Sequence, residues 1–233
     1  MFLLGTLCLI YIIPCSWIDA FLVRKKPFET RYAHMRFWSK HLLRCFHCKV
    51  IVDWKTTLPE EGSILFVSNH QSAFDMILQM AVLSTCFTFI SKEENKKIPF
   101  VSSWSKSLEL IYFNRDDRKS AIHMLREAAR QLKSGRNLLI FPEGTRSKDG
   151  SLLPLHAGSI QPAYMAKATI VVVVLQNSYE YKLNLLKHKP FALTVLKKYE
   201  YEDYHTMKVE TLCEQIQQEM EEERNKYKNF HEK

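Results

Sequence analysis

The sequence predicts an α/β fold: a single domain with a largely parallel central sheet flanked by helices, preceded by an N-terminal membrane-binding helical pair. Short apolar runs typical of strands alternate along the chain with amphipathic segments typical of helices. The 233 residues, 46% of them hydrophobic, suffice for one globular core. The first 23 residues are apolar, with Asp19 as their one charged side chain. We therefore expect membrane attachment through residues 1–48 and the α/β domain over 49–233.

The N-terminal segment is long enough to cross a bilayer. As a helix, its apolar positions would reach about 33 Å, which matches the hydrocarbon core of a membrane. A cleaved signal peptide fits poorly, because no basic region precedes the segment and no small-x-small cleavage site follows it. The basic run 24–26 would hold the following chain on the cytoplasmic side. Pro14 and Asp19 leave open whether residues 2–23 span the bilayer or insert into one leaflet.

The next segment is predicted to be a basic amphipathic helix. Between residues 24 and 49 there are eight Lys or Arg and one acid, Glu29, so this stretch is +7 of the chain's +8. Apolar residues recur there at steps of three and four: Phe28, Tyr32, Met35, Trp38, Leu42 and Phe46. This pattern favours attachment to an anionic membrane surface, and the alternative is a core helix with a solvated basic face. Nucleic acid is a weaker explanation, because no recognisable binding motif accompanies the charge.

The remaining chain is predicted to alternate strands and helices around a parallel sheet. We expect strands at 49–54, 63–69, 87–91, 109–114, 137–141, 169–176 and 191–201, and helices at 72–84, 117–135, 158–168 and 206–227. Ligands of such sheets gather beyond the carboxyl ends of the strands. Polar clusters follow three of the expected strands, after residues 68, 113 and 141, so these clusters are the candidate functional site.

The first cluster contains His70 and Asp75. Side chains five residues apart in one helix point some 140° apart, so the two can pair only if His70 lies in the turn before the helix and Asp75 in its first turn. Ser72 and Asp75 resemble a capping box, in which case Asp75 merely caps the helix and His70 is an ordinary turn residue. Alternatively, the carboxylate orients an imidazole that accepts a proton. The chain has no G-x-S-x-G elbow, so such a base would act on a hydroxyl of the substrate.

The other two clusters supply cations. Arg115 follows the strand at 109–114, and Arg146 ends the sequence F-P-E-G-T-R at 141–146. An arginine can hold a phosphate or carboxylate bidentately, although an isolated arginine is more often a solvated loop charge. Lys92, after the strand at 87–91, has the same two interpretations.

The six cysteines do not form a disulfide framework or a metal site. Cys45 and Cys48 make a single C-x-x-C with no second pair to complete a zinc tetrahedron. We interpret the cysteines as reduced thiols packed in a cytosolic protein, and we expect no metal.

These motifs together resemble the glycerolipid acyltransferase family. The resemblance rests on N-H-x-x-x-x-D at Asn69–Asp75, on the strand ending near Arg115 and on F-P-E-G-T-R at Phe141–Arg146, in this order. It runs from about residue 60 to about residue 180 and looks most like the bacterial-type 1-acyl-sn-glycerol-3-phosphate acyltransferases. The F-P-E-G-T-R block is highly specific, whereas the H-x-x-x-x-D spacing alone is not.

The resemblance implies a role for each of these residues. His70 would be the general base on the acceptor hydroxyl, and Asp75 would orient it. The substrate-binding residues would be Lys92, Arg115, Glu143, Gly144, Thr145 and Arg146, with the arginines on a phosphate. The resemblance implies no cofactor and no metal. The co-substrate would be an acyl thioester of coenzyme A or acyl carrier protein, and the product of 1-acyl-sn-glycerol-3-phosphate would be phosphatidic acid.

Several alternatives stay open. The acceptor could be another lysophospholipid or a lyso-ornithine lipid, His70 could activate water in a thioesterase, or the chain could be a non-catalytic membrane protein that binds lipid or acyl carrier protein. The sequence departs from the family pattern in three places. Thr169 and Val172 stand where prolines are usual, and Ala157 stands where a lysine is usual. Glu109 and Leu110 lie in a region that often holds a glycine. The expected location is the cytoplasmic face of a bacterial inner membrane or its equivalent, with membrane lipids as partners and no nucleic acid.

Overall fold

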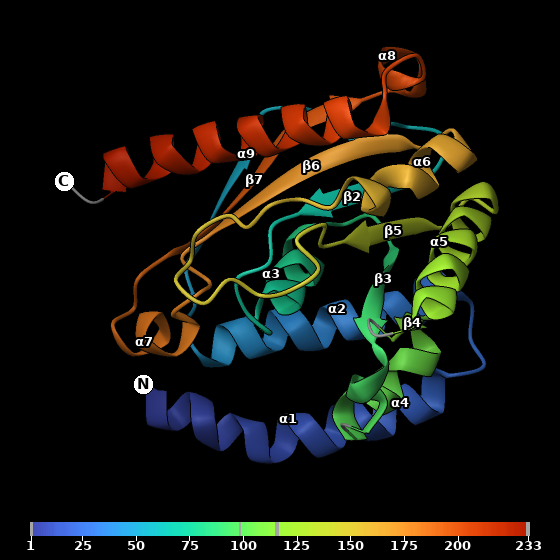
Figure 1. The fold of residues 1–233 in the computed structure, drawn as a ribbon. Coiled ribbons are helices and arrows are strands. Elements are labelled where there is room, and N and C mark those ends of the chain that lie inside the picture. Colours follow the sequence, from blue (N-terminus) through green and yellow to red (C-terminus); the bar gives the residue numbers. More distant parts are fainter. Residues whose placement is uncertain (1, 98, 115–116, 232–233) are drawn as a thin grey trace.

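The computed structural model describes residues 2–97, 99–114 and 117–231. These residues form a central sheet between two layers of helices (Figure 1). The seven strands of the described residues lie in the order β1-β7-β6-β2-β5-β3-β4. Every neighbouring pair is parallel except β6 and β7. The strands are β1 (Val50–Trp54), β2 (Ile64–Ser68), β3 (Phe87–Lys92), β4 (Ile111–Phe113), β5 (Asn137–Ile140), β6 (Thr169–Gln176) and β7 (Phe191–Tyr199). The predicted largely parallel sheet is confirmed.

Helices cover both faces of this sheet (Figure 1). One layer consists of α1 (Phe2–Val23), α2 (Phe28–Cys45), α3 (Asp75–Val82) and α4 (Pro99–Ser107). The other consists of α5 (Arg118–Lys133), α6 (Gln161–Ala166) and α9 (Val209–His231). Shorter elements complete the fold: α7 (Tyr181–Leu186), α8 (Tyr201–Tyr204) and the 3₁₀ turns Glu93–Lys97 and Ala157–Ile160.

The core has two halves because side chains alternate across the central strands. Along β6, Val171 and Val173 point to the cluster under α2, α3 and α4, whereas Val172 and Val174 point to the cluster under α5, α6 and α9. All eight residues of β6 are buried. Burial on both faces explains why this strand reads as a continuous apolar run rather than as an alternating one.

The seven predicted strands are all present, but the helices differ in extent and number. The helix expected at 72–84 begins only at Asp75, because residues 70–74 form the turn of the candidate site. Helix α5 matches its prediction: the Asp117 side chain accepts from Lys119 N–H at 2.9 Å, and the chain leaves the helix at Gly135, whose φ is +83°. Helices α4, α7 and α8 were not predicted, since each is short and lacks a clear apolar period.

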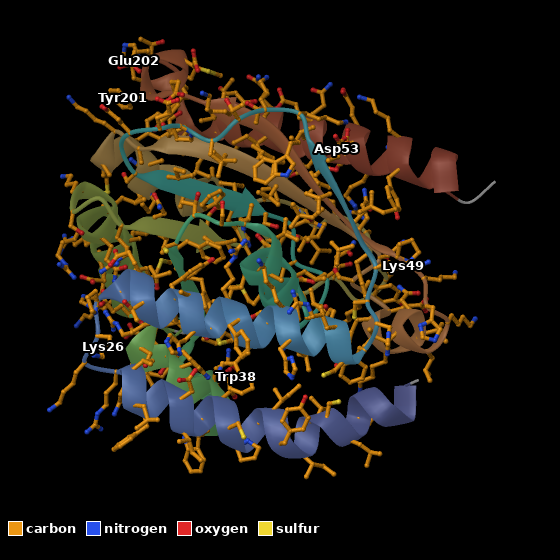
Figure 2. The ribbon with its side chains drawn as sticks, turned by 180° about the vertical axis from the view of Figure 1, so that it is seen from behind. Lys26, Trp38, Lys49, Asp53, Tyr201 and Glu202 are labelled. Carbon is orange, nitrogen blue, oxygen red and sulfur yellow. The ribbon has the colours of Figure 1, made fainter. Side chains whose placement is uncertain are left out.

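Helix α2 turns its apolar face to the core. Phe28, Tyr32, Met35 and Phe46 are buried in the cluster that also contains α3 and α4 residues. Trp38 is partly buried and lies at the boundary between α1 and α2 (Figure 2), where its Nε1 donates to Asp19 Oδ2 at 2.7 Å. The core-helix interpretation therefore holds for this face, which is not available to lipid.

Helix α1 instead carries the exposed apolar surface. Residues Gly5–Val23 are long and apolar enough to cross a membrane, and only 22% of that stretch is buried. The exposed side chains are Leu7, Ile10, Tyr11, Ile13, Trp17, Ile18, Phe21 and Leu22. A contiguous apolar face of this kind indicates association with a membrane. Asp19 holds the helix to α2, because it accepts from His34 Nδ1 at 2.9 Å as well as from Trp38.

Glu109 occupies a backbone position that favours glycine. Its φ is +54°, in the left-handed region. Its carboxylate pairs with Arg31 of α2 and, at 3.0 Å, with Arg136 at the start of β5. These two ion pairs join the segment before β4 to α2 and to the start of β5.

Candidate active site

The candidate site lies beyond the carboxyl ends of two neighbouring parallel strands. Strand β2 leads into His70 and β5 leads into Phe141, and the strands pair in register at Val67 and Ile140. Ser147 N donates to His70 O at 2.9 Å, which joins the two loops that follow. The first and third polar clusters of the sequence therefore meet at one edge of the sheet, as the topology of parallel sheets requires.

His70 and Asp75 form a hydrogen-bonded pair. His70 Nδ1 lies 2.7 Å from Asp75 Oδ2. The geometric condition set by the spacing is met, because His70 precedes the helix and Asp75 is the first residue of α3. The Asp75 side chain is fully buried, whereas the His70 side chain keeps 18% of its surface exposed. No hydrogen bond from a described residue engages His70 Nε2, so this atom is available to a substrate.

The Asp75 carboxylate also organises the turn around it. Its Oδ2 accepts from Gln71 N at 2.7 Å and from Ser72 N at 2.9 Å, and its Oδ1 accepts from Ser72 Oγ at 3.0 Å. A carboxylate is an acceptor only, so His70 must donate from Nδ1 and present Nε2 as its basic nitrogen. The capping and catalytic interpretations of Asp75 were alternatives from the sequence. Helix α3 has Phe74 as its N-cap and no side-chain cap, so the Asp75 carboxylate closes the turn before the helix and pairs with His70.

Phe141 fixes the plane of the imidazole. The two rings stack with centroids 4.0 Å apart and an interplanar angle of 18°. Sequence reasoning used Phe141 only as the first letter of a motif and did not predict this contact. The motif itself was the available signal, because it places an aromatic residue directly before the Pro-Glu-Gly turn.

Glu143 ties the two loops together. Its Oε1 accepts from His70 N at 2.6 Å, and its Oε2 accepts from Leu153 N at 2.8 Å. The residue is 3% exposed. Burial raises the pKa of Glu143 to about 7, and the two main-chain N–H groups and the nearby Arg224 charge oppose that rise. Both carboxylate oxygens thus accept a main-chain N–H, and the role in substrate binding that the resemblance implies stays a prediction.

The residues after Glu143 turn outward. Gly144 adopts a φ of +62°, and its N–H donates to Phe141 O at 2.9 Å, which closes a tight turn. Thr145 and Arg146 are exposed. Arg146 forms no hydrogen bond or ion pair with the described residues, so its guanidinium can take up an anion from solution.

Of the two further predicted cations, Lys92 and Arg115, the structure describes only Lys92. Lys92 ends β3, which pairs with β5 in parallel, so Lys92 lies at the carboxyl edge of the sheet and is partly exposed. The prediction for Arg115 concerns a position outside the described residues. The structure thus brings His70, Asp75 and Glu143 into one bonded group and places Lys92 at the same edge.

A supporting network was not predicted. Gln71 accepts from Ser178 N at 3.1 Å and from Ser178 Oγ at 2.9 Å, and it donates to Gly150 O at 3.2 Å. Arg224, from α9, donates to the same Gly150 carbonyl and is 5% exposed. These partners are far apart in the sequence and follow no motif, so no local signal could have found them.

The cysteines and possible metal ligands do not extend the site. All six cysteines lie in the described residues and are free thiols. Within residues 2–97, 99–114 and 117–231, no group of three or more His, Cys, Asp or Glu side chains is arranged to hold a metal ion. The chemistry of the described site is therefore that of an imidazole, two carboxyl groups and nearby cations.

The raised pKa of Glu143 predicts a pH-dependent stability. Folding favours the protonated carboxyl, so its contribution to the free energy of unfolding is fully present below pH 4.5 and is lost as the pH rises through about 7. Glu143→Gln stays neutral and removes this change, although its amide nitrogen leaves one main-chain N–H without an acceptor, at about 1–3 kcal/mol. Urea unfolding from pH 5 to 8 measures the effect. We expect the deficit of the variant to shrink toward pH 8, and a constant deficit would contradict the prediction.

Comparison with known proteins places the fold and the motifs in one family. A TM-score of 0.77 relates the chain to the crystal structure of the 1-acyl-sn-glycerophosphate acyltransferase PlsC from Thermotoga maritima, at 24% identity over 97% of this chain and 95% of that one. A 1-acyl-sn-glycerol-3-phosphate acyltransferase from Borreliella burgdorferi is 28% identical over 163 residues, which are 66% of this chain and 65% of the relative. A protein of the same description from Helicobacter pylori is 35% identical over 120 residues, 51% of each chain.

These alignments span about half to two thirds of the curated relatives, and the structural likeness at 24% identity establishes the fold alone. The family model described as Acyltransferase matches residues 49–176, more than half of the chain and all of the predicted site residues. The resemblance inferred from the motifs is thereby confirmed, and the chain belongs to the acyltransferase family.

Proposed function

We propose that this protein transfers an acyl chain from an acyl thioester to the free hydroxyl of 1-acyl-sn-glycerol-3-phosphate and so forms phosphatidic acid. The observation that carries the proposal is the His70–Asp75 pair at 2.7 Å at the carboxyl edge of the sheet, where no described residue bonds to Nε2 of His70. The names of the matched relatives support the choice of acceptor. The exposed apolar face of α1 suits an acceptor that resides in a membrane.

The geometry supports a direct transfer. His70 Nε2 takes the proton of the acceptor hydroxyl as the oxygen attacks the thioester carbonyl carbon. Asp75 keeps the proton on Nδ1 and stabilises the imidazolium that forms. The tetrahedral intermediate then collapses, the carbon–sulfur bond breaks, and the imidazolium returns its proton to the departing thiolate. No protein nucleophile is required.

Cations at the same edge would hold the acceptor. Arg146 is exposed and without a partner among the described residues, and Lys92 ends the adjacent part of the sheet. A phosphomonoester gives charge-assisted, bidentate hydrogen bonds with a guanidinium. We include Arg115 and Thr145 in the proposed acceptor site on the strength of the family motif. Glu143 contributes by positioning, because it holds the His70 backbone in place.

A product assay with purified full-length protein tests the proposal. The protein is supplied with acyl-coenzyme A or acyl carrier protein thioester, with and without lysolipid, and products are measured by mass spectrometry. Acyl transfer gives the diacyl product only when the lysolipid is present. Free fatty acid regardless of acceptor would identify a thioesterase, and no turnover with either donor would identify a binding protein. A lysolipid panel, including a lyso-ornithine lipid, determines the acceptor, and the two thioesters determine the donor.

Removal of the Arg146 side chain should impair phosphate-bearing acceptors selectively. A charge-assisted hydrogen bond is worth about 1.5–3 kcal/mol, so Arg146→Ala should lower kcat/KM for lysophosphatidate by roughly 10- to 100-fold. The kcat/KM for a monoacylglycerol, which lacks the phosphate, should fall little. Steady-state kinetics with both acceptors measure the difference.

Arg126→Ala is the matched control, because Arg126 is an exposed arginine of α5 and forms no ion pair with the described residues. Arg126→Ala should leave kcat/KM for both acceptors unchanged. Equal losses for the two acceptors in Arg146→Ala would remove Arg146 from the phosphate site while leaving the assignment of His70 intact.

A further inference from the structure

Helix α7 and the turn after it combine exposed cations with exposed apolar side chains. Lys182, Lys187 and Lys189 are exposed, and Leu183 and Leu186 expose 37% and 51% of their surface. Single exposed leucines are ordinary on a soluble surface. Leucines interleaved with lysines are instead typical of segments that lie in the interface of a membrane.

This segment adjoins the C-terminal end of α2. Residues 46–49 lie against Asn184, Leu185, His188 and Lys189. A main-chain hydrogen bond from Phe191 N to Lys49 O, at 2.9 Å, ties the two segments together. We name this surface the α7 corner, and it consists of His47, Lys49, Lys182, Leu183, Leu186, Lys187, His188 and Lys189.

The α7 corner lies near the N-terminal end of α1. Phe46 lies beside the α7 segment, and its ring also packs on Gly5 of α1 so closely that a Cβ there would lie 2.6 Å from a ring carbon. Figure 1 accordingly shows α7 next to the N-terminal end of α1. Phe46, at the end of α2, therefore lies between the N-terminal end of α1 and the α7 segment.

The lysines of the α7 corner form no ion pair with the described residues, and the turns that carry them are held by main-chain hydrogen bonds. None of them forms an ion pair with a carboxylate in the described residues, whereas Lys197 pairs with Glu219 at 2.6 Å and Lys198 with Glu200 at 2.9 Å elsewhere on the surface. Main-chain hydrogen bonds fix both turns: Cys48 N to Leu43 O at 2.8 Å and Lys189 N to Asn184 O at 2.9 Å. A concentrated positive charge on rigid turns is complementary to a surface of anionic phosphates.

We propose that the α7 corner is a second membrane contact, which binds the headgroups of anionic phospholipids in the bilayer that receives the apolar face of α1. The leucines enter the interface and the lysines meet the phosphates. A single helix lying in the interface leaves the body free to roll about the helix axis. A contact to one side of that axis removes this freedom and sets the orientation of the whole domain on the membrane.

Vesicle binding of the purified full-length protein tests this surface without any assay of turnover. The Lys182→Gln/Lys187→Gln/Lys189→Gln variant is compared with wild type on phosphatidylcholine vesicles and on vesicles that also contain phosphatidylglycerol. Each lysine near an anionic surface contributes roughly fivefold in partitioning, so the variant should bind the anionic vesicles on the order of 10²-fold more weakly. Binding to neutral vesicles should not change, and added salt should reduce the difference.

The matched control replaces three exposed lysines elsewhere, Lys119, Lys133 and Lys208, with glutamine. It changes the net charge equally and should retain most of the binding. Wild-type binding by the α7 variant, or an equal loss in the control, would overturn the proposal. So would normal vesicle binding together with a raised KM for acyl carrier protein, which would assign the α7 corner to an acidic protein. Because partitioning is measured without substrates, its outcome is separate from that of the proposed acyl transfer.

Discussion

Replacement of His70 by alanine should lower kcat by about 10²–10⁴-fold, which is the usual contribution of a positioned general base. The imidazole of His70 can accept a proton at Nε2, because its Nδ1 is held by the buried carboxylate of Asp75. Without it, the acceptor hydroxyl must lose its proton to water. Steady-state kinetics with saturating thioester and lysophosphatidate measure the loss.

Loss of folding must be separated from loss of the base. His70→Ala removes a ring stack on Phe141, worth about 0.5–1.5 kcal/mol, so the variant should unfold at a slightly lower temperature but cooperatively. His123→Ala, at an exposed position on α5, controls for the removal of an imidazole and should keep wild-type kcat. Turnover close to wild type in a folded His70→Ala protein would exclude His70 as the base.

Much of this site could be predicted because it depends on short-range patterns. The strand periodicity placed His70 and Phe141 directly after two parallel strands, and such strands bring their carboxyl ends to one edge. Helical geometry requires His70 to precede the helix and Asp75 to lie in its first turn if the two are to pair, and the structure meets this condition. The sequence could not decide between a helix cap and an orienting carboxylate, because the answer depends on where the helix begins, and α3 begins only at Asp75.

The parts that could not be predicted depend on tertiary contacts. The amphipathic pattern of α2 is the same whether its apolar face meets lipid or protein, and only the packing of Tyr32 and Phe46 in the core decides. Glu143 looked like a substrate ligand in its motif, yet its partners are main-chain groups of residues 70 and 153. Arg224, on the last helix, joins the site only by donating to the Gly150 carbonyl, and no local sequence pattern predicts such a contact.

Asp75→Asn should lower kcat by about 10²-fold, toward the lower end of the range for general-base catalysis, while preserving the fold. The reason lies in the asymmetry of the carboxylate. Oδ2 faces three N–H donors, those of His70 Nδ1, Gln71 and Ser72, whereas Oδ1 faces only the Ser72 hydroxyl. An asparagine can place its oxygen toward the three donors and its NH₂ toward the hydroxyl, which rotates to accept.

The tautomer of His70 is therefore retained in this variant, and only the charge that stabilises the imidazolium is lost. Where an asparagine imposes the wrong tautomer on a catalytic histidine, the loss is about 10⁴-fold. Nitrogen-15 NMR of the imidazole distinguishes the two cases, because it reports which ring nitrogen carries the proton. An Nε2–H tautomer with a 10⁴-fold loss would show that the amide adopts the opposite orientation. Wild-type kcat would show instead that the charge of Asp75 does not assist the transfer.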